Sequence, residues 1–170
     1  MAERGGKTWK FGDEINTDVM APGMYFKLPV EEAVKHCLEA VDPTFAPGVQ
    51  PGDIVVAGSN FGVGSSREQA AMAFRLLNVG AILAVSFARI FYRNALNLGV
   101  PALILPQADE IMAGDQVRVD PIAGRVENLT QNKTYTVEPI PAHLMEMIEA
   151  GGLMAHLKNL IARGALHASR

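Results

Sequence analysis

The sequence predicts an α/β fold with a mainly parallel sheet, and two observations support this prediction. Short apolar runs alternate with amphipathic stretches through the middle of the chain, and strands that alternate with helices are joined by crossovers that make neighbouring strands parallel. The 170 residues, of which 49% are hydrophobic and 19% charged, are enough to bury one sizeable core. We therefore expect residues 1–170 to form a single domain.

The central elements follow one another as strand, helix, strand, helix and strand. The strands are short apolar runs near glycines or prolines, and the first helix places Ala70, Phe74 and Leu77 on one face. The expected ranges are Ile54–Ala57, Ser66–Leu77, Ala81–Val85, Phe87–Asn97 and Ala102–Leu105.

The N-terminal segment adds a short strand and a helix. Lys7–Phe11 is the expected strand. Pro29 suits the first position of a helix, because its missing N–H group costs nothing there, and Glu31 and Glu32 suit the positive end of the helix dipole. The apolar face of this helix is expected to comprise Ala33, Val34, Cys37, Leu38 and Val41.

The C-terminal segment changes character after Pro106. Short strands joined by turns are expected at residues 116–120, 125–128 and 134–137. Two helices are expected within residues 142–163, separated by Gly151 and Gly152 and packed on this domain or on a partner.

The composition argues against several classes of function. A net charge of −3 and the absence of a run of like charges argue against nucleic-acid binding. The single cysteine, Cys37, cannot form an intrachain disulfide, as is typical of a reducing compartment, and is expected to be a packing residue on a helix. Met1–Phe11 lacks the apolar core of a signal peptide, and no apolar run is long enough to span a membrane. We expect a cytoplasmic protein without a membrane partner.

The histidines give no sign of a metal site. They are scattered, no metal-ligand spacing joins them, and they are expected to face solvent. The four positions are His36, His143, His156 and His167.

The strongest local motif is the glycine-rich loop Gly58–Glu68, which lies between an expected strand and an expected helix. Its glycines allow a tight turn and a close approach to a ligand. Ser65 or Ser66 would cap the helix, the helix start favours an anion, and Arg67 adds a planar fork suited to a carboxylate or phosphate. A tight turn with a capping serine and a surface arginine is the simpler interpretation of the loop alone.

Other glycine motifs do not fit this loop. No lysine follows the glycines as in a Walker A motif, Arg67 stands where a dinucleotide fingerprint requires glycine, and the G-x-S-x-G elbow of serine hydrolases is absent. The spacing therefore argues against an ATPase, a dinucleotide-binding enzyme and an esterase.

Several motifs together carry a more specific resemblance. Gly62–Glu68, Ser86–Ala95, the Asn16-Thr17-Asp18 stretch and Met24–Lys27 resemble, in order and spacing, the small subunits of isopropylmalate isomerases and the corresponding mobile domain of aconitases. The match extends from about Phe11 to Leu105. The resemblance implies a single swivelling β/β/α domain of the aconitase superfamily.

The resemblance also implies a heteromeric hydro-lyase. In this family a large-subunit partner holds a 4Fe-4S iron–sulfur cluster, and water is removed from and returned to a small hydroxy-dicarboxylate substrate. A chain with one cysteine cannot provide the ligands of such a cluster, which agrees with the small-subunit half. The expected reaction is the isomerisation of 3-isopropylmalate and 2-isopropylmalate, a step of leucine biosynthesis.

Roles transfer from the family one residue at a time. Ser65 matches the serine that acts as base, and Ser66 matches a neighbour that helps build the site. Arg67 matches an arginine that binds a substrate carboxylate, and Asp18 an active-site aspartate; without the resemblance, Asp18 would be interpreted as a turn-stabilising carboxylate.

The loop Met24–Leu28 falls where the family has its substrate-specificity loop. Tyr25, Phe26 and Lys27 are the expected substrate-binding residues there. A cation flanked by Phe26 and Leu28 suits a carboxylate beside a branched alkyl group, as in isopropylmalate or a smaller methylated malate. The alternative is that Lys27 faces solvent and Phe26 packs in the core.

Three departures from the family pattern leave alternatives for the substrate. Val63 stands where cysteine is frequent, Gln69 where histidine is frequent, and residues 25–28 differ from the usual Tyr-Leu-Arg-Thr. A homoaconitase or methylmalate-type dehydratase small subunit is therefore an alternative. From other classes, a non-catalytic anion-binding module, or a domain that swivels against a partner only to close that partner's site, would use the same loop.

Overall fold

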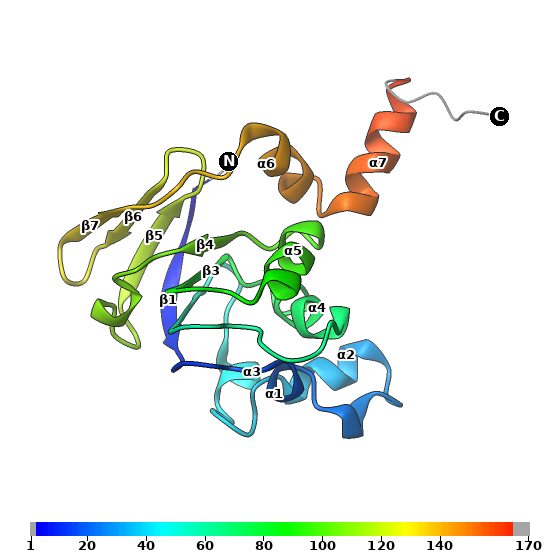
Figure 1. The fold of residues 1–170 in the computed structure, drawn as a ribbon, viewed down its shortest axis with the longest axis horizontal. Coiled ribbons are helices and arrows are strands. Elements are labelled where there is room, and N and C mark those ends of the chain that lie inside the picture. The colour runs from blue at the N-terminus through cyan, green and yellow to red at the C-terminus, as the bar shows by residue number, and fades with distance from the viewer. Residues whose placement is uncertain (1–2, 165–170) are drawn as a thin grey trace.

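The computed structural model describes residues 3–164, and its centre is a seven-stranded mixed sheet with the strand order β4-β3-β2-β1-β5-β6-β7 (Figure 1). The N-terminal strand, β1 (Arg4–Lys10), lies in the middle of this order. On one side of β1 the strands are parallel, and on the other side they are antiparallel. The predicted α/β class is confirmed, and β1 joins two halves of different character.

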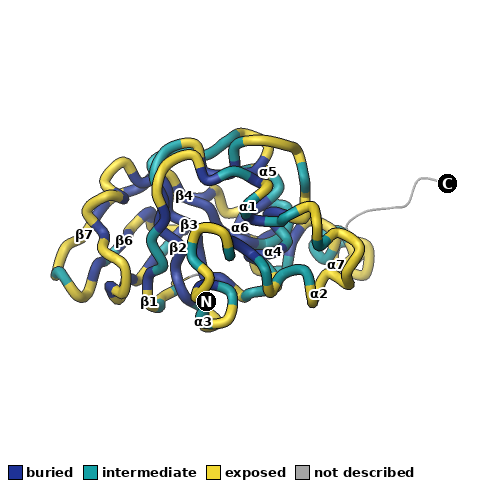
Figure 2. Tube along the Cα trace, turned by 90° about the horizontal axis from the view of Figure 1, so that it is seen from below, coloured by how far each residue is buried: buried dark blue, intermediate teal, exposed yellow. Residues whose placement is uncertain are grey.

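The parallel half contains β2 (Ile54–Ala57), β3 (Ala81–Ala84) and β4 (Ala102–Ile104). All residues of β2 and β3 are buried, as expected of parallel strands that are covered on both faces (Figure 2). These three strands agree with the predicted ranges to within one residue, because a continuous apolar run between turns identifies such a strand.

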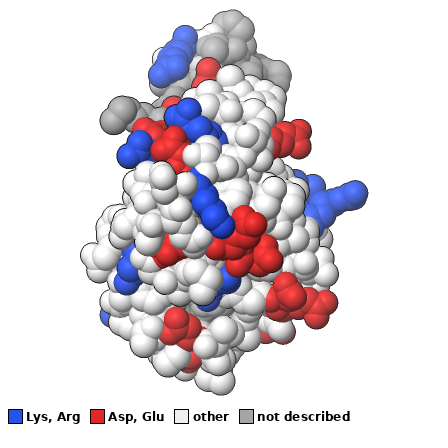
Figure 3. Space-filling view, turned by 90° about the vertical axis from the view of Figure 1, so that its left-hand side faces the viewer, with Lys and Arg blue, Asp and Glu red and all other residues white. Residues whose placement is uncertain are grey.

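The antiparallel half contains β5 (Gln116–Asp120), β6 (Arg125–Asn128) and β7 (Lys133–Thr136). Burial alternates along β5, with Val117 and Val119 inside. Cationic and acidic side chains are interspersed on the face at this end of the molecule (Figure 3), and Arg118 and Arg125 both pair with Glu127. This face therefore presents no uniformly basic surface.

The longer helices form a connected series beside the sheet (Figure 1). Contacts join α4 (Glu68–Leu76) to α5 (Arg89–Asn97), α5 to α6 (Ala142–Glu149), and α6 to α7 (Leu153–Ala162). Arg75 of α4 fastens this series, because its Nη1 donates to the carbonyl oxygens of Leu98 and Gly151.

A cluster of phenylalanines lies at the centre of the core. Phe61 follows β2 and contacts Phe74 of α4 and Phe91 of α5, with ring centroids 5.8 and 5.3 Å apart. Phe74 and Phe91 contact each other at 6.0 Å. All three rings are buried. The start of the glycine-rich loop is therefore anchored to both helices by aromatic packing.

The helix predicted from Pro29 to Val41 begins where it was expected but ends early. Pro29 precedes α2 (Val30–Ala33), a 3-10 turn η2 (Val34–His36) follows, and the chain leaves the helix at Cys37 with ψ 123°. Leu38 has a positive φ of 59°, and its N–H donates to the carbonyl of Val19. Cys37 is buried, as predicted, but the break turns Cys37 and Leu38 into the core without a continuous helical face.

The remaining short helical elements lie between strands along the chain. They are α1 (Thr17–Met20), η1 (Gly23–Tyr25), α3 (Phe45–Gly48) and η3 (Ala108–Glu110). None of the helices between residues 3 and 164 has the length and apolar character that a bilayer crossing requires.

Gly62→Ala is expected to destabilise the protein by about 1–3 kcal/mol. Gly62 has φ 89°, and an added Cβ would lie 2.2 Å from Cγ of Phe91. Urea unfolding measures the change. Gly12→Ala is the control, because nothing lies within 4 Å of a Cβ there. Equal unfolding midpoints for the two variants would show that the loop tolerates a displaced Phe91.

Candidate active site

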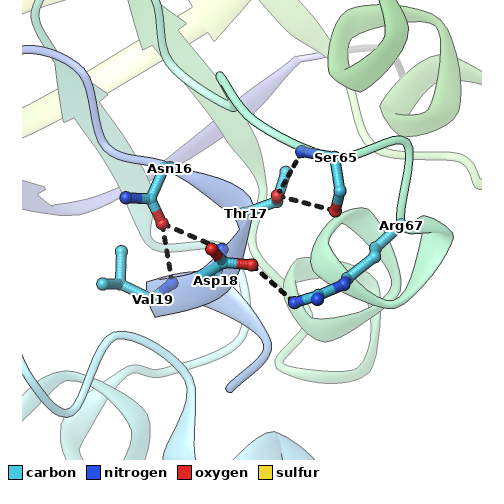
Figure 4. A network of polar contacts seen from close by, with 6 residues as sticks. All are labelled: Asn16, Thr17, Asp18, Val19, Ser65 and Arg67. Atoms are coloured by element: carbon cyan, nitrogen blue, oxygen red, sulfur yellow. Dashed lines mark hydrogen bonds and ion pairs between the residues drawn. The ribbon is translucent and has the colours of Figure 1, made fainter. Parts of the chain in front are cut away.

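Two segments far apart in the sequence meet beyond the ends of β1 and β2. The first is the turn Asn16–Met20, which contains α1, and the second is the end of the glycine-rich loop, Gly62–Arg67 (Figure 4). Asn16 caps α1, because its Oδ1 accepts hydrogen bonds from the N–H groups of Asp18 and Val19 at 2.9 and 3.1 Å. An Asn-Thr-Asp sequence is suited to such a side-chain cap.

Backbone hydrogen bonds fasten the turn to the loop. The N–H of Gly62 donates to Ile15 O at 2.8 Å, and the N–H of Thr17 donates to Val63 O at 2.9 Å. Asn16 and Val63 form an isolated parallel bridge. The backbone contact involves Val63 only through its peptide groups, so the departure from cysteine at this position leaves it unchanged.

Ser65 is held by Thr17 (Figure 4). The N–H of Ser65 donates to Thr17 Oγ1 at 3.1 Å, and the two hydroxyl oxygens are also 3.1 Å apart. Thr17 is buried, whereas Ser65 and Ser66 are exposed. The Ser65 hydroxyl is therefore held by the buried Thr17 hydroxyl and is still accessible to a ligand.

The prediction that Ser65 or Ser66 caps the following helix is wrong. Arg67 is the N-cap residue of α4, and no side chain caps this helix. The helix begins at Glu68 rather than at Ser66, because Arg67 is extended, with φ −60° and ψ 115°. Ser65 is drawn toward Thr17 instead of the helix start.

Arg67 lies between a carboxylate and an aromatic ring. Its Nη1 donates to Asp18 Oδ1 at 2.5 Å, and its guanidinium carbon is 5.0 Å from the ring centroid of Phe26. Both contacts restrict a long, flexible side chain. The other N–H groups of the fork make no hydrogen bond within the described part of the chain, so they are available to a planar anion.

Tyr25 contacts Glu39 and His36. Its hydroxyl donates to Glu39 Oε1 at 2.6 Å, and its ring stacks on His36 with centroids 3.6 Å apart. His36, expected to face solvent, bonds Glu39 Oε2 through Nδ1 at 2.7 Å. The hydrogen bond from Tyr25, followed by the one from His36, lowers the pKa of Glu39. The Tyr25–Glu39 hydrogen bond also raises the pKa of Tyr25.

The segment Met24–Leu28 borders a cavity of about 190 Å³ that the sequence did not predict. Met20, Phe26, Leu28, Val34 and Ala73 contribute to its wall, and Gln69 is its one polar side chain. Phe26 is 42% exposed and lines this cavity rather than the core. Lys27 is exposed and forms no ion pair or hydrogen bond with any described residue. The sequence could not reveal this cavity, because its wall combines residues 20–34 with residues 69–73, which meet only in the folded chain.

The residues of this chain do not fit an iron–sulfur cluster. Burial raises the pKa of the Cys37 thiol far above its ordinary value, which disfavours the thiolate that a metal requires. Among residues 3–164, no group of three or more histidine, cysteine, aspartate or glutamate side chains is placed to hold a metal ion. His167 lies outside the described residues.

Glu39→Gln is expected to remove a pH-dependent part of the stability. Because the folded pKa of Glu39 lies below its usual 4.5, its contribution is present above that value and is lost as the pH falls through the folded pKa. Thermal unfolding from about pH 6 to about pH 3 should show the gap between wild type and variant closing with acid. Glu31→Gln, which alters an exposed carboxylate without a described partner, is the control. A constant gap would contradict the assignment.

Comparisons with known proteins identify the family of this chain. Residues 13–108 match the model of the aconitase C-terminal domain family. The chain is 50% identical over 155 residues to the Thermotoga maritima 3-isopropylmalate dehydratase small subunit 1, covering 90% of this chain and 93% of the relative. It is 46% identical over 162 residues to the Wolinella succinogenes 3-isopropylmalate dehydratase small subunit, covering 95% and 97%.

A solved structure is similar over nearly the whole chain. The crystal structure of a 3-isopropylmalate dehydratase from Methanocaldococcus jannaschii superposes with a TM-score of 0.89 at 40% identity, covering 96% of this chain and 98% of that one. The family suggested by the motifs is thereby confirmed. The chain belongs to the aconitase C-terminal domain family, within the group of 3-isopropylmalate dehydratase small subunits.

Proposed function

We propose that this chain is the small subunit of a hydro-lyase that interconverts 3-isopropylmalate and 2-isopropylmalate. In this proposal it supplies a serine base and carboxylate-binding groups to a site shared with a large subunit. The observation that carries the proposal is the arrangement of Ser65 and Arg67. The two side chains come from one loop, and each is fixed by a neighbour on the Asn16–Met20 turn.

Ser65 is the proposed base. As an alkoxide, its Oγ takes the proton from the carbon next to a substrate carboxylate, so that a new O–H bond forms while the C–H bond breaks. The electron pair of that C–H bond forms the carbon–carbon double bond, and the hydroxyl group on the neighbouring carbon departs as hydroxide, which adds back in the second half of the reaction. In the re-addition half of the reaction the proton returns to carbon and Oγ again carries the charge. A serine hydroxyl ionises only in a preorganised electrostatic site. In this proposal the positive charge of Arg67, two residues further along the loop, contributes to such a site, and Ser66 lies between the two residues in sequence.

Arg67 is the proposed anchor of a substrate carboxylate. Asp18 engages one N–H of the fork and leaves the others for the ligand. A guanidinium pinned on two sides loses less conformational entropy on binding than a mobile one. In this proposal Asp18 orients Arg67 toward the substrate carboxylate.

The specificity loop supports an alkylmalate substrate. Lys27 offers a free cation for the second carboxylate, and the apolar cavity below the loop can take a branched alkyl group. Tyr25 stabilises the loop through Glu39, while Phe26 forms part of the wall. Citrate and homocitrate carry a third carboxylate in place of the alkyl group, and an apolar cavity disfavours a charged group.

A large-subunit partner is part of the proposal, because the relatives are named small subunits and the one cysteine of this chain is a buried thiol that does not suit a cluster. The partner would hold the 4Fe-4S cluster. Whereas α6 buries Met145, Met147 and Ile148 on this chain, α7 buries none of its residues and leaves Met154 68% exposed. We place α7 against the partner. In the same proposal the enzyme serves leucine biosynthesis in the cytoplasm.

Ser65→Ala is expected to lower kcat of the reconstituted enzyme by about a hundredfold or more, because base catalysis is lost. Turnover of 3-isopropylmalate is followed through the absorbance of the unsaturated intermediate. Ser59→Ala is the matched control in the same loop, since the Ser59 hydroxyl makes no hydrogen bond with a described residue. A Ser65→Ala enzyme that assembles with its partner and keeps near-normal kcat would rule out the proposed base.

Lys27→Ala is expected to lower kcat/KM for 3-isopropylmalate by about tenfold or more, because a charge-assisted hydrogen bond is lost. Lys35→Ala is the control, since Lys35 already pairs with Glu32 at 3.0 Å. The comparison includes a smaller methylated malate, citrate and homocitrate. Preference for a tricarboxylate, or indifference to Lys27→Ala, would favour a homoaconitase-type substrate instead.

A further inference from the structure

We infer that Thr17 is the positioning residue of the catalytic serine and that its hydroxyl donates a hydrogen bond to Ser65 Oγ when Ser65 acts as base. This inference rests on the proposed function of Ser65 and adds a residue to it. Thr17 is the first residue of α1, is only 1% exposed, and contacts Ser65 through its hydroxyl (Figure 4). It touches the base rather than the substrate.

The donor and acceptor roles follow from counting protons and lone pairs. A threonine hydroxyl has one hydrogen and two lone pairs. One lone pair of Thr17 Oγ1 accepts the N–H of Ser65 at 3.1 Å. The contact between the two hydroxyl oxygens, also 3.1 Å, can run in either direction while Ser65 keeps its proton. Once Ser65 has lost that proton, only Thr17 can be the donor.

The direction matters because a hydrogen bond to an ionised oxygen is about twice as strong as one between neutral groups. The Thr17 hydroxyl therefore favours the form of Ser65 that accepts the proton from carbon. Arg67 is turned toward Asp18, so among the described residues Thr17 is the one whose side chain contacts the Ser65 hydroxyl.

The backbone holds the Thr17 hydroxyl in place. The N–H of Thr17 donates to Val63 O, and its carbonyl accepts the N–H of Ala21 at 3.0 Å. Gly64 brings the loop close, because a Cβ added there would lie 3.0 Å from Thr17 Oγ1. Because Thr17 is buried and its backbone is held at two points, its hydroxyl has little freedom to turn away from Ser65. Such a fixed neighbour keeps the base in one orientation.

Two substitutions separate positioning from packing. Thr17→Val keeps the buried methyl group and removes the hydroxyl, whereas Thr17→Ser keeps the hydroxyl and removes the methyl group. If Thr17 positions Ser65, the reconstituted Thr17→Val enzyme loses kcat by about tenfold or more with little change in KM, and Thr17→Ser retains kcat. Urea unfolding should rank the variants in the opposite order, with Thr17→Ser the less stable.

The same series in the Ser65→Ala background completes the test. Thr17→Val should have little further effect on the residual kcat, because the hydroxyl acts through Ser65. An equal loss in both backgrounds would overturn the inference, as would a folded Thr17→Ser enzyme with strongly reduced kcat. Near-normal kcat of Ser65→Ala would refute the proposed function itself. Loss in Ser65→Ala with none in Thr17→Val would refute only the role of Thr17.

Discussion

The attachment of the Asn16–Met20 turn to the glycine-rich loop is the constraint on which the site depends. The loop carries Ser65 and Arg67, and the turn carries their partners Thr17 and Asp18. Backbone hydrogen bonds at Gly62 and Val63 fix the distance between the segments. Because both contacts span the same junction, a shift of the loop would disturb the serine and the arginine together. The junction in turn rests on the buried rings around Phe61.

Much of this arrangement could be predicted from the sequence, for identifiable physical reasons. The apolar runs of β2 and β3 are buried throughout, so their sequences carry the parallel-sheet signal. The alternation in β5 likewise identifies a strand with one buried face. Asp18, Ser65 and Arg67 came from the resemblance to a family, and the structure brings them into one site although the chain between them is long.

The wrong predictions concern positions where a hydrogen bond to a residue distant in sequence outweighs the local preference for helix or helix cap. Ser65 suits a helix cap, but the Thr17 hydroxyl competes for it and Arg67 takes the capping position. Residues 33–41 have a helical apolar period, yet the N–H of Leu38 bonds to Val19 and the chain turns inward. The cavity beside Phe26 needs residues from two separate segments, 20–34 and 69–73, which a local pattern cannot bring together.

The central position of β1 also affects how the chain is made. This strand leaves the ribosome before its neighbours in the sheet, because its parallel partner β2 begins at Ile54 and its antiparallel partner β5 begins at Gln116. Synthesis of the intervening chain takes on the order of ten seconds. During that time at least one edge of β1 is open to intermolecular pairing. The alternating exposed residues of β1, with Lys7 among them, lower that risk until the second half of the protein arrives.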